Sequence, residues 1–262
     1  MRILYILFSH SIFIAAGVFA QQYHTITTYN LIFSAQTYWL FIFAALAAYN
    51  LYYWFSIHIK QPGLLLVGFF NGSSHLWTAL VTGAMATVLY FRQSDFDPLF
   101  VMIGLFTLLY FGFVFSKYGR PDCHPVFRLL KVLLLAWVWW LAVFFYPIRQ
   151  TEIPVDATLS WHACSRYCLL ILICLIYDCK DDLLQRHDLW WKSIFALITG
   201  LLVISGMVAS VNFDQYLLTW MMAGICACFF YMPRHPSGFW FYAFWTDGLL
   251  ILPVLLQQVM SI

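Results

Sequence analysis

Charged side chains are the scarcest feature of this chain. Of its 262 residues, 9% are charged and 63% are hydrophobic, whereas a soluble domain carries about 25% charged residues. One soluble core cannot bury that much apolar surface, so lipid must be the solvent for most of the chain. The net charge is only +2, and no face concentrates lysine and arginine, which excludes a nucleic-acid binder.

Several catalytic signatures are also missing. The sequence has no G-x-x-x-x-G-K-[ST], H-E-x-x-H or G-x-S-x-G pattern, which excludes nucleotide hydrolysis by a P-loop and the best-known hydrolase sites. Seven cysteines are present, but their spacings match no zinc signature. Most of them lie inside apolar runs, and we interpret them as small hydrophobic residues.

Long apolar runs are what the chain has instead. A membrane-spanning helix needs about 20 largely apolar residues, and nine runs approach that length. They predict an all-α polytopic membrane protein with about nine transmembrane helices, forming a single domain over residues 1–262. The predicted spans are 2–20, 31–55, 66–91, 97–116, 126–147, 159–178, 190–210, 214–231 and 238–259.

The first run has two interpretations. Arg2, the apolar stretch and the small residues before Gln21 resemble a secretory signal with a cleavage site. Because Ser9-His10-Ser11 interrupts the apolar region, we favour a retained helix.

The positions of the cations predict the orientation of the spans. Cytoplasmic loops of membrane proteins are enriched in lysine and arginine. With the N-terminus in the cytoplasm, ten cations lie on the inner side and three on the outer side. We therefore expect an integral protein of the cytoplasmic membrane with its C-terminus outside. The inner cations are Arg2, Lys60, Lys117, Arg120, Arg128, Lys131, Lys180, Arg186, Lys192 and Arg234, and the outer ones are Arg92, Arg149 and Arg166.

Three aspartates gather at the cytoplasmic end of the sixth predicted span. Asp178, Asp181 and Asp182 are spaced i, i+3 and i+4, so they share one face if the helix continues. Carboxylates this close repel one another unless cations neutralise them. Mg²⁺ prefers oxygen ligands and is often held by carboxylates together with substrate phosphates. The alternative is local ion pairing with Lys180 and Arg186, which needs no function.

A second group of polar side chains lies near the end of the second predicted span. Asn50, Trp54 and His58 follow one another at intervals of four and therefore share a helical face. Asn50 lies deep in an apolar run, where a buried amide needs a partner. It is either a ligand of a bound group or a partner in an interhelical hydrogen bond. We interpret Tyr52, Tyr53 and Trp54 as interfacial aromatic residues, with lining of a cavity mouth as the alternative.

These features together resemble the UbiA superfamily of intramembrane prenyltransferases. That family has nine transmembrane helices around a central cavity and two cytoplasmic Asp-rich motifs, after the second and sixth helices. Asp178-Cys-Lys-Asp181-Asp182 resembles the second motif, and Tyr49-Asn50 falls where the first begins. Lys131 before the apolar fifth span and Asp247-Gly248 in the last span resemble a divergent branch of the superfamily.

The resemblance implies an Mg²⁺-dependent transfer of an isoprenoid chain from a polyprenyl diphosphate to a lipophilic acceptor. It implies Mg²⁺ ligation by Asp178, Asp181 and Asp182, with Asp178, Asp182 and Lys131 as catalytic residues. The diphosphate and its metal would also be met by further residues of the cytoplasmic face. These are Asn50, His58, Arg128, Lys117 and Arg120.

The first motif departs from the family pattern. Leu51, Trp54 and His58 stand where the family has aspartates, so half of the expected carboxylate cage is missing. This departure leaves a second interpretation, in which the chain is a non-catalytic UbiA-like scaffold or a subunit that binds a membrane-protein partner. A transporter is a third, but such proteins place polar residues and broken helices at mid-membrane, and few internal polar residues are present.

Overall fold

The computed structural model describes residues 11–60, 73–93, 97–115, 125–150, 156–179, 189–209, 213–231, 248–256 and 258. Every element within these residues is helical. The helices are α2 (Ile12–Tyr29), α3 (Ala35–Lys60), α5 (Ser73–Arg92), α6 (Pro98–Phe115), α7 (Pro125–Trp140), η3 (Leu141–Phe145), α8 (Tyr146–Arg149), α9 (Ala157–Cys179), α11 (Leu189–Ala209) and α12 (Phe213–Tyr231), followed by a short helix over residues 248–256.

The observed helices agree closely with most of the predicted spans. The second to eighth predictions lie within several residues of α3, α5, α6, the continuous α7–η3–α8 unit, α9, α11 and α12. Four of the described helices are long and apolar enough to cross a membrane, and they cover Pro98–Phe115, Pro125–Arg149, Ala157–Ile176 and Leu189–Ala209. The chain is therefore an all-α protein with helices suited to a bilayer.

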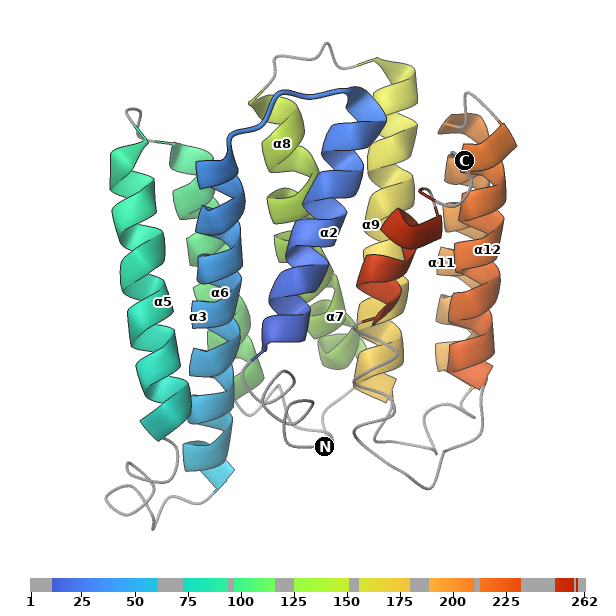
Figure 1. Ribbon diagram of the computed structural model, residues 1–262. Coiled ribbons are helices and arrows are strands. Elements are labelled where there is room, and N and C mark those ends of the chain that lie inside the picture. The colour runs from blue at the N-terminus through green and yellow to red at the C-terminus, as the bar shows by residue number, and fades with distance from the viewer. Residues whose placement is uncertain are drawn as a thin grey trace.

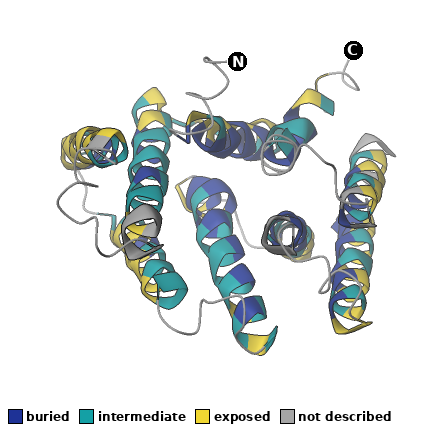
Figure 2. Ribbon diagram, turned by 90° about the horizontal axis from the view of Figure 1, so that it is seen from below, coloured by how far each residue is buried: buried dark blue, intermediate teal, exposed yellow. Residues whose placement is uncertain are grey.

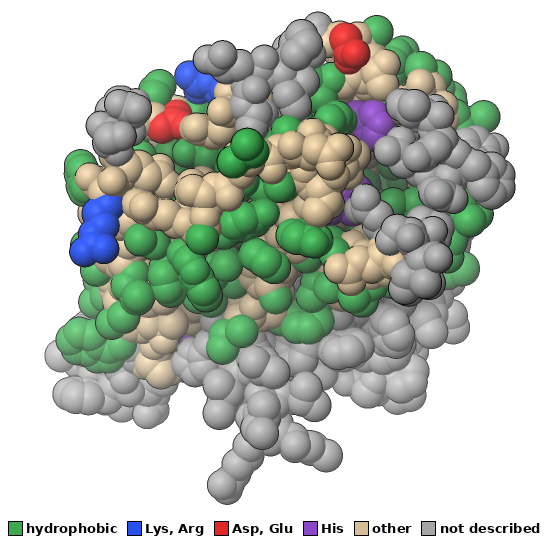
Figure 3. Space-filling view, turned by 45° about the horizontal axis from the view of Figure 1, so that its top comes forward, with side chains coloured by type: hydrophobic (Ala, Val, Ile, Leu, Met, Phe, Trp, Pro, Cys, Tyr) green, Lys and Arg blue, Asp and Glu red, His purple; other side chains and the backbone are tan. Residues whose placement is uncertain are grey.

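The helices run roughly side by side in a bundle (Figure 1). In that view α3, α6, α9 and α12 end at the lower end, where α2, α5, α7 and α11 begin. Seen from below, the exposed residues lie on the outward sides of the peripheral helices, and the buried residues face inward (Figure 2). Hydrophobic side chains also cover much of the flank in Figure 3, where the few charged side chains drawn lie toward its edges. This distribution is the one expected of a bundle whose sides face lipid.

The first helix lies further along the chain than predicted. The prediction of a span over residues 2–20 is wrong at its end, because α2 continues to Tyr29. Residues 1–10 lie outside the described part of the chain. The polar residues that follow Ala20 do not end the helix because the bundle supplies their hydrogen-bond partners. The side chain of Gln22 donates to the carbonyl of Ala142 at 3.0 Å, and Thr25 donates to that of Val143 at 2.9 Å.

A π-helical segment makes those two carbonyls available. Helix α7 widens into η3 at Leu141–Phe145 before it continues as α8. A π-turn breaks the regular i to i−4 hydrogen bonding and is frequent at functional sites. Here it lets backbone oxygens of η3 bind side chains of α2, so that α2 packs against the middle of the bundle.

Polar contacts at the upper end join α6 to α8. Asp97 accepts from the backbone N–H of Leu99 at 2.9 Å and from the side chain of Gln150 at 2.7 Å. The Arg149 guanidinium lies 3.8 Å from the same carboxylate. A carboxylate at a helix start also interacts favourably with the helix dipole, so Asp97 fixes the start of α6 beside the end of α8.

Close packing of α11 on α12 depends on Gly206. A Cβ atom at this position would lie 2.3 Å from Cγ2 of Thr219 on α12. We expect Gly206→Ala to lower the stability of the bundle by about 1–3 kcal/mol, the usual cost of overpacking. The midpoint of thermal unfolding in detergent would fall. Gly200→Ala is the matched control, because a Cβ there meets nothing within 4 Å, and an equal effect of both variants would contradict this packing.

Candidate functional site

A cavity of about 800 Å³ lies within the bundle on the side away from α11 and α12, none of whose described residues line it. Its walls come from α2, α3, α5, α6, the α7–η3 unit, α9 and the short helix 248–256. Nearly all of its lining side chains are aliphatic or aromatic, because each helix turns an apolar stripe inward. The volume lies within the range of about 300–1,000 Å³ typical of small-molecule sites, and the lining suits an apolar chain.

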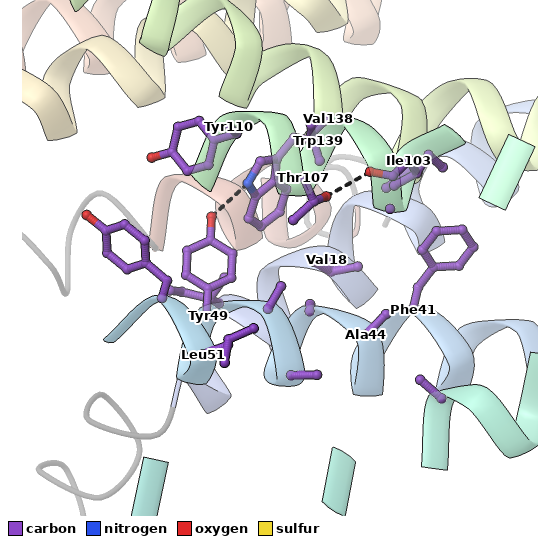
Figure 4. Close-up of a pocket in the computed structure, with 18 of the residues that line it drawn as sticks. Val18, Phe41, Ala44, Tyr49, Leu51, Ile103, Thr107, Tyr110, Val138 and Trp139 are labelled. Carbon is purple, nitrogen blue, oxygen red and sulfur yellow. Dashed lines mark hydrogen bonds between the residues drawn. The ribbon is translucent and has the colours of Figure 1, made fainter. Parts of the chain in front are cut away.

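Aromatic side chains line the cavity toward both of its ends, with Phe41, Tyr90 and Phe100 in its upper part (Figure 1). Tyr49 projects from α3 toward Trp139 of α7, and the indole N–H donates to the Tyr49 hydroxyl at 2.9 Å (Figure 4). Tyr110 of α6 lies beside this pair (Figure 4). Tyr52 and Tyr53 also line the cavity, so the alternative of a lining role holds for these two of the three residues for which we considered it. Trp54 does not belong to the lining, and its ring lies 5.0 Å from that of Phe55.

The cavity opens on the flank of the bundle. Leu80 of α5 and Leu105 and Leu108 of α6 line it, although 54%, 61% and 61% of their surfaces are exposed. Side chains that are both lining and exposed mark an opening rather than a closed wall. In a bilayer this opening would face the acyl chains, and an apolar ligand would reach the cavity without crossing water.

The end of α9 lies level with the beginning of α7. The two helices run in opposite directions, because Trp140 donates to the Ala163 carbonyl at 2.9 Å and Tyr167 donates to that of Leu133 at 3.2 Å. Following this register along both helices places the backbone of Asp178 level with the first turn of α7. Arg128 and Lys131 are one and two turns further into the bundle. The second acidic motif therefore starts at the same end of the bundle as two of the predicted diphosphate-binding cations.

Arg128 is held tightly at this end. Only 6% of its surface is exposed, and its guanidinium carbon lies 5.9 Å from the ring centre of Trp191 on α11. A cation over an indole face is stabilised by the ring quadrupole. This contact fixes the stem of Arg128 between α7 and α11.

The register of α3 separates two of the residues predicted to act together. The Tyr49–Trp139 bond and the 4.7 Å contact between the Phe41 and Tyr146 rings align α3 with α7. By this alignment the backbone of His58 is level with Lys131. Asn50 is level with residue 138 and lies eight residues from His58 on α3, which is about 12 Å along the axis at about 1.5 Å per residue.

Asn50 contacts α5 instead. It is fully buried, its Oδ1 atom lies 3.0 Å from Nδ1 of His75, and its amide donates to the Leu46 carbonyl at 2.8 Å. Asn50 therefore makes an interhelical hydrogen bond of the kind that we considered as its alternative role. Its contact with a diphosphate stays a prediction.

A double-mutant cycle between Asn50 and His75 separates the two roles. We expect Asn50→Ala to destabilise the fold by about 0.5–1.5 kcal/mol, because it removes the part-buried hydrogen bond to the His75 ring. His75→Ala should add little to that cost. The measurement is thermal unfolding together with binding of an isoprenoid diphosphate. A loss of binding in Asn50→Ala without any loss of stability would instead indicate a ligand role.

Several predicted site residues cannot be compared with the structure. Asp181, Asp182, Lys117 and Arg120 lie outside the described residues, and the described parts of Asp178 and His58 are their helical backbones. Within the described part of the chain, no three histidine, cysteine, aspartate or glutamate side chains come together to hold a metal ion. Magnesium binding by the second motif therefore stays a prediction.

The sequence did not single out the residues that shape the cavity. Trp139, Tyr110 and Gly104 lie in runs that are apolar throughout, and periodicity alone cannot distinguish a wall facing a cavity from one facing lipid. The only available signal was the local density of tyrosine and tryptophan at 49–54 and 137–140. Comparison with protein-family models, curated proteins and solved structures finds no match to the chain.

Proposed function

We propose that the protein is a divergent UbiA-like prenyltransferase, which moves an isoprenoid chain from a diphosphate donor to a lipophilic acceptor. The observation that carries the proposal is the apolar cavity of about 800 Å³, open toward lipid and lined by aliphatic and aromatic side chains. Lys131 and Arg128 lie on α7 one and two turns below the lining residue Leu135, toward the end of the bundle that the backbone of Asp178 reaches on α9. An isoprenoid diphosphate matches this arrangement, because its apolar chain would lie in the cavity and its charged head would lie beside the cations.

Different residues act on the two fragments of the donor, which are the diphosphate and the isoprenoid chain. The bond from the allylic carbon to the diphosphate oxygen breaks, and the diphosphate leaves with the electron pair. Arg128 and Lys131, with Lys117 and Arg120, stabilise the charge on the leaving group. Bound Mg²⁺, held by Asp178, Asp181 and Asp182, would neutralise part of the same charge.

The aromatic walls of the cavity act on the isoprenoid fragment. The allylic cation lies at the lower end of the cavity, beside the lining residues Tyr52 and Tyr53 of α3, whose π faces attract a cation most strongly where water is excluded. An electron-rich carbon of the acceptor donates an electron pair to the cation, forming the new bond, and the acceptor then loses a proton. A dry cavity prevents water from taking the place of the acceptor.

The charge distribution supports an orientation with this end in the cytoplasm. Arg128, Lys131 and Lys192 lie in the first turns of α7 and α11 at the lower end, and Arg92 and Arg149 lie at the upper end. Most of the remaining cations belong to sequence segments that connect the lower helix ends. We propose nine membrane spans, with the N-terminus in the cytoplasm and the C-terminus outside.

The proposal is tested by binding to the full-length protein in lipid nanodiscs. Farnesyl thiodiphosphate, which resists ionisation, should bind in the presence of Mg²⁺ and should bind at least tenfold more weakly in EDTA. Farnesol, which has the same chain without the charged head, should not show this dependence on Mg²⁺. Equal affinity for both compounds, or affinity unaffected by EDTA, would contradict the proposal.

A non-catalytic scaffold or partner subunit is the second candidate. One observation favours it: the amide of Asn50, the remaining residue of the first motif, is engaged by His75. Under this candidate the wild-type protein binds no isoprenoid diphosphate, and its apolar flank contacts a membrane-protein partner. The nanodisc measurement distinguishes the two candidates.

A further inference from the structure

A buried polar cluster lies beside the cavity, away from the expected diphosphate end. It consists of Gln21, Gln22 and His24 of α2 and Arg166 of α9. The guanidinium of Arg166 donates to Oε1 of Gln21 at 3.3 Å and contacts the imidazole of His24. Gln21 and Gln22 are 2% and 0% exposed. Arg166 thus points into the bundle and does not reach along its surface to an interface.

The cluster continues the walls of the cavity. Val18 of α2 and Leu170 of α9 line the cavity, and Gln22 and Arg166 lie one turn from them on the same helical faces. Two other lining residues accept hydrogen bonds from the cluster through their carbonyls. Gln22 donates to Ala142 at 3.0 Å, and Gln21 donates to Leu250. None of the four side chains is itself a lining residue, so the cluster lies one helical turn beyond the lined space, where only a head group at the end of a ligand would meet it.

The charge of this cluster is unbalanced. Among the described residues Arg166 has no acidic partner, and Gln21 and His24 are neutral acceptors. A guanidinium has five N–H donors, and these contacts use only some of them. An ionised side chain at membrane depth is costly unless it is paired, and such residues usually mark a ligand or ion site. Within the described residues, an anion is therefore the group that would balance this site.

We propose that the cavity binds a long-chain carboxylic acid, with its carboxylate on Arg166 and its tail along the apolar walls. A single guanidinium matches a single carboxylate in charge and forms two parallel hydrogen bonds with it. A phosphate dianion would need a second cation, and none of the other described cations lies in this cluster. The inference does not depend on isoprenoid transfer, because it concerns the opposite part of the cavity wall.

Among alternative ligands, the alcohol with the same chain length as the acid fits this site most nearly as well. Oε1 of Gln22 is buried and has no hydrogen-bond partner within the described structure, so it can accept from a hydroxyl group. An alcohol would satisfy this acceptor but leave the charge of Arg166 unbalanced. The acid should therefore bind more tightly than the alcohol, and an amine should bind most weakly.

This order of affinities is tested with palmitic acid, hexadecanol and hexadecylamine as ligands. The measurement is native mass spectrometry of the full-length protein released from nanodiscs. The wild-type protein should retain palmitic acid at concentrations at least tenfold below those needed for hexadecanol. Arg166→Gln should remove that preference, whereas Arg149→Gln should keep it, because Arg149 pairs with Asp97 at the upper end. If Arg166→Gln does not fold, Arg166→Lys should keep a preference for the acid at reduced affinity, because it retains the charge without the planar fork.

Two results would overturn the inference. One is that the wild-type protein retains palmitic acid and hexadecanol equally. An acidic residue elsewhere in the chain that already neutralised Arg166 would give this result. The other is a preference for the acid that survives in Arg166→Gln. Neither result bears on Mg²⁺-dependent binding of farnesyl thiodiphosphate, so failure of this inference is distinguishable from failure of the proposed function.

Discussion

Replacing both Asp178 and Asp182 with asparagine is expected to reduce isoprenoid transfer by about 100-fold or more, the loss typical when a preorganised group opposite a developing charge is removed. The two variants keep the size and hydrogen-bonding capacity of the side chains but remove two negative charges from the proposed magnesium site. Carboxylates are the ligands that Mg²⁺ prefers, together with substrate phosphates. Amides would leave the diphosphate with too little cationic charge beside it.

The measurement is binding of farnesyl thiodiphosphate as a function of Mg²⁺ concentration. At a Mg²⁺ concentration that saturates the wild type, the double variant should bind the compound far more weakly, and EDTA should change its binding much less than that of the wild type. Asp156→Asn is the control, because Asp156 lies at the beginning of α9, at the other end of the bundle, where it accepts from the backbone of Leu159 at 2.6 Å. Equal binding by wild type and the double variant would remove the second motif from the site.

Filling the cavity should have the second largest effect. Gly104 of α6 lines the cavity, and a Cβ atom there meets nothing within 4 Å. Gly104→Phe would place a benzyl group in the space proposed for the isoprenoid chain. We expect farnesyl thiodiphosphate to bind about 10- to 100-fold more weakly, since overpacking costs about 1–3 kcal/mol and each 1.4 kcal/mol is tenfold in affinity.

Chain length provides an internal check on this variant. A dimethylallyl analogue, which is two isoprene units shorter, should lose much less affinity than the farnesyl compound. Gly112→Phe is the matched control on the same helix, because Gly112 also has open space around it but does not line the cavity. If Gly112→Phe weakened binding as much as Gly104→Phe, the effect would arise from α6 as a whole and not from the cavity.

The helices themselves were largely predictable. In a bilayer the apolar length of a segment decides where a helix runs, and runs such as 97–116 and 190–210 have few competing signals. The structure accordingly has α6 at Pro98–Phe115 and α11 at Leu189–Ala209. The exception is α2, where the polar pair Gln21 and Gln22 suggested an end. Those residues stay inside a helix because their partners come from η3, α9 and the helix 248–256, which are distant in sequence.

The candidate site was less predictable than the fold. The three aspartates stood out because charges are rare in this chain, and the cations near α7 stood out for the same reason. The contact of Asn50 with His75 was not apparent from the sequence, because His75 is 25 residues away and lies on another helix. The cavity likewise depends on which faces of seven elements meet, and tertiary packing of uniformly apolar helices leaves no periodic signal.

The central claim is that an isoprenoid chain lies in the cavity with its diphosphate at the lower end. Photo-crosslinking tests this claim most directly. The probe is a farnesyl diphosphate analogue with a benzophenone at the end of the chain, applied to the wild-type protein in nanodiscs. The account predicts Mg²⁺-dependent adducts on peptides of α3, α6 and α7 that carry lining residues such as Ala45, Gly104 and Val138. Adducts on lipid-facing residues such as Leu197 and Ile204 of α11, independent of Mg²⁺, would contradict it.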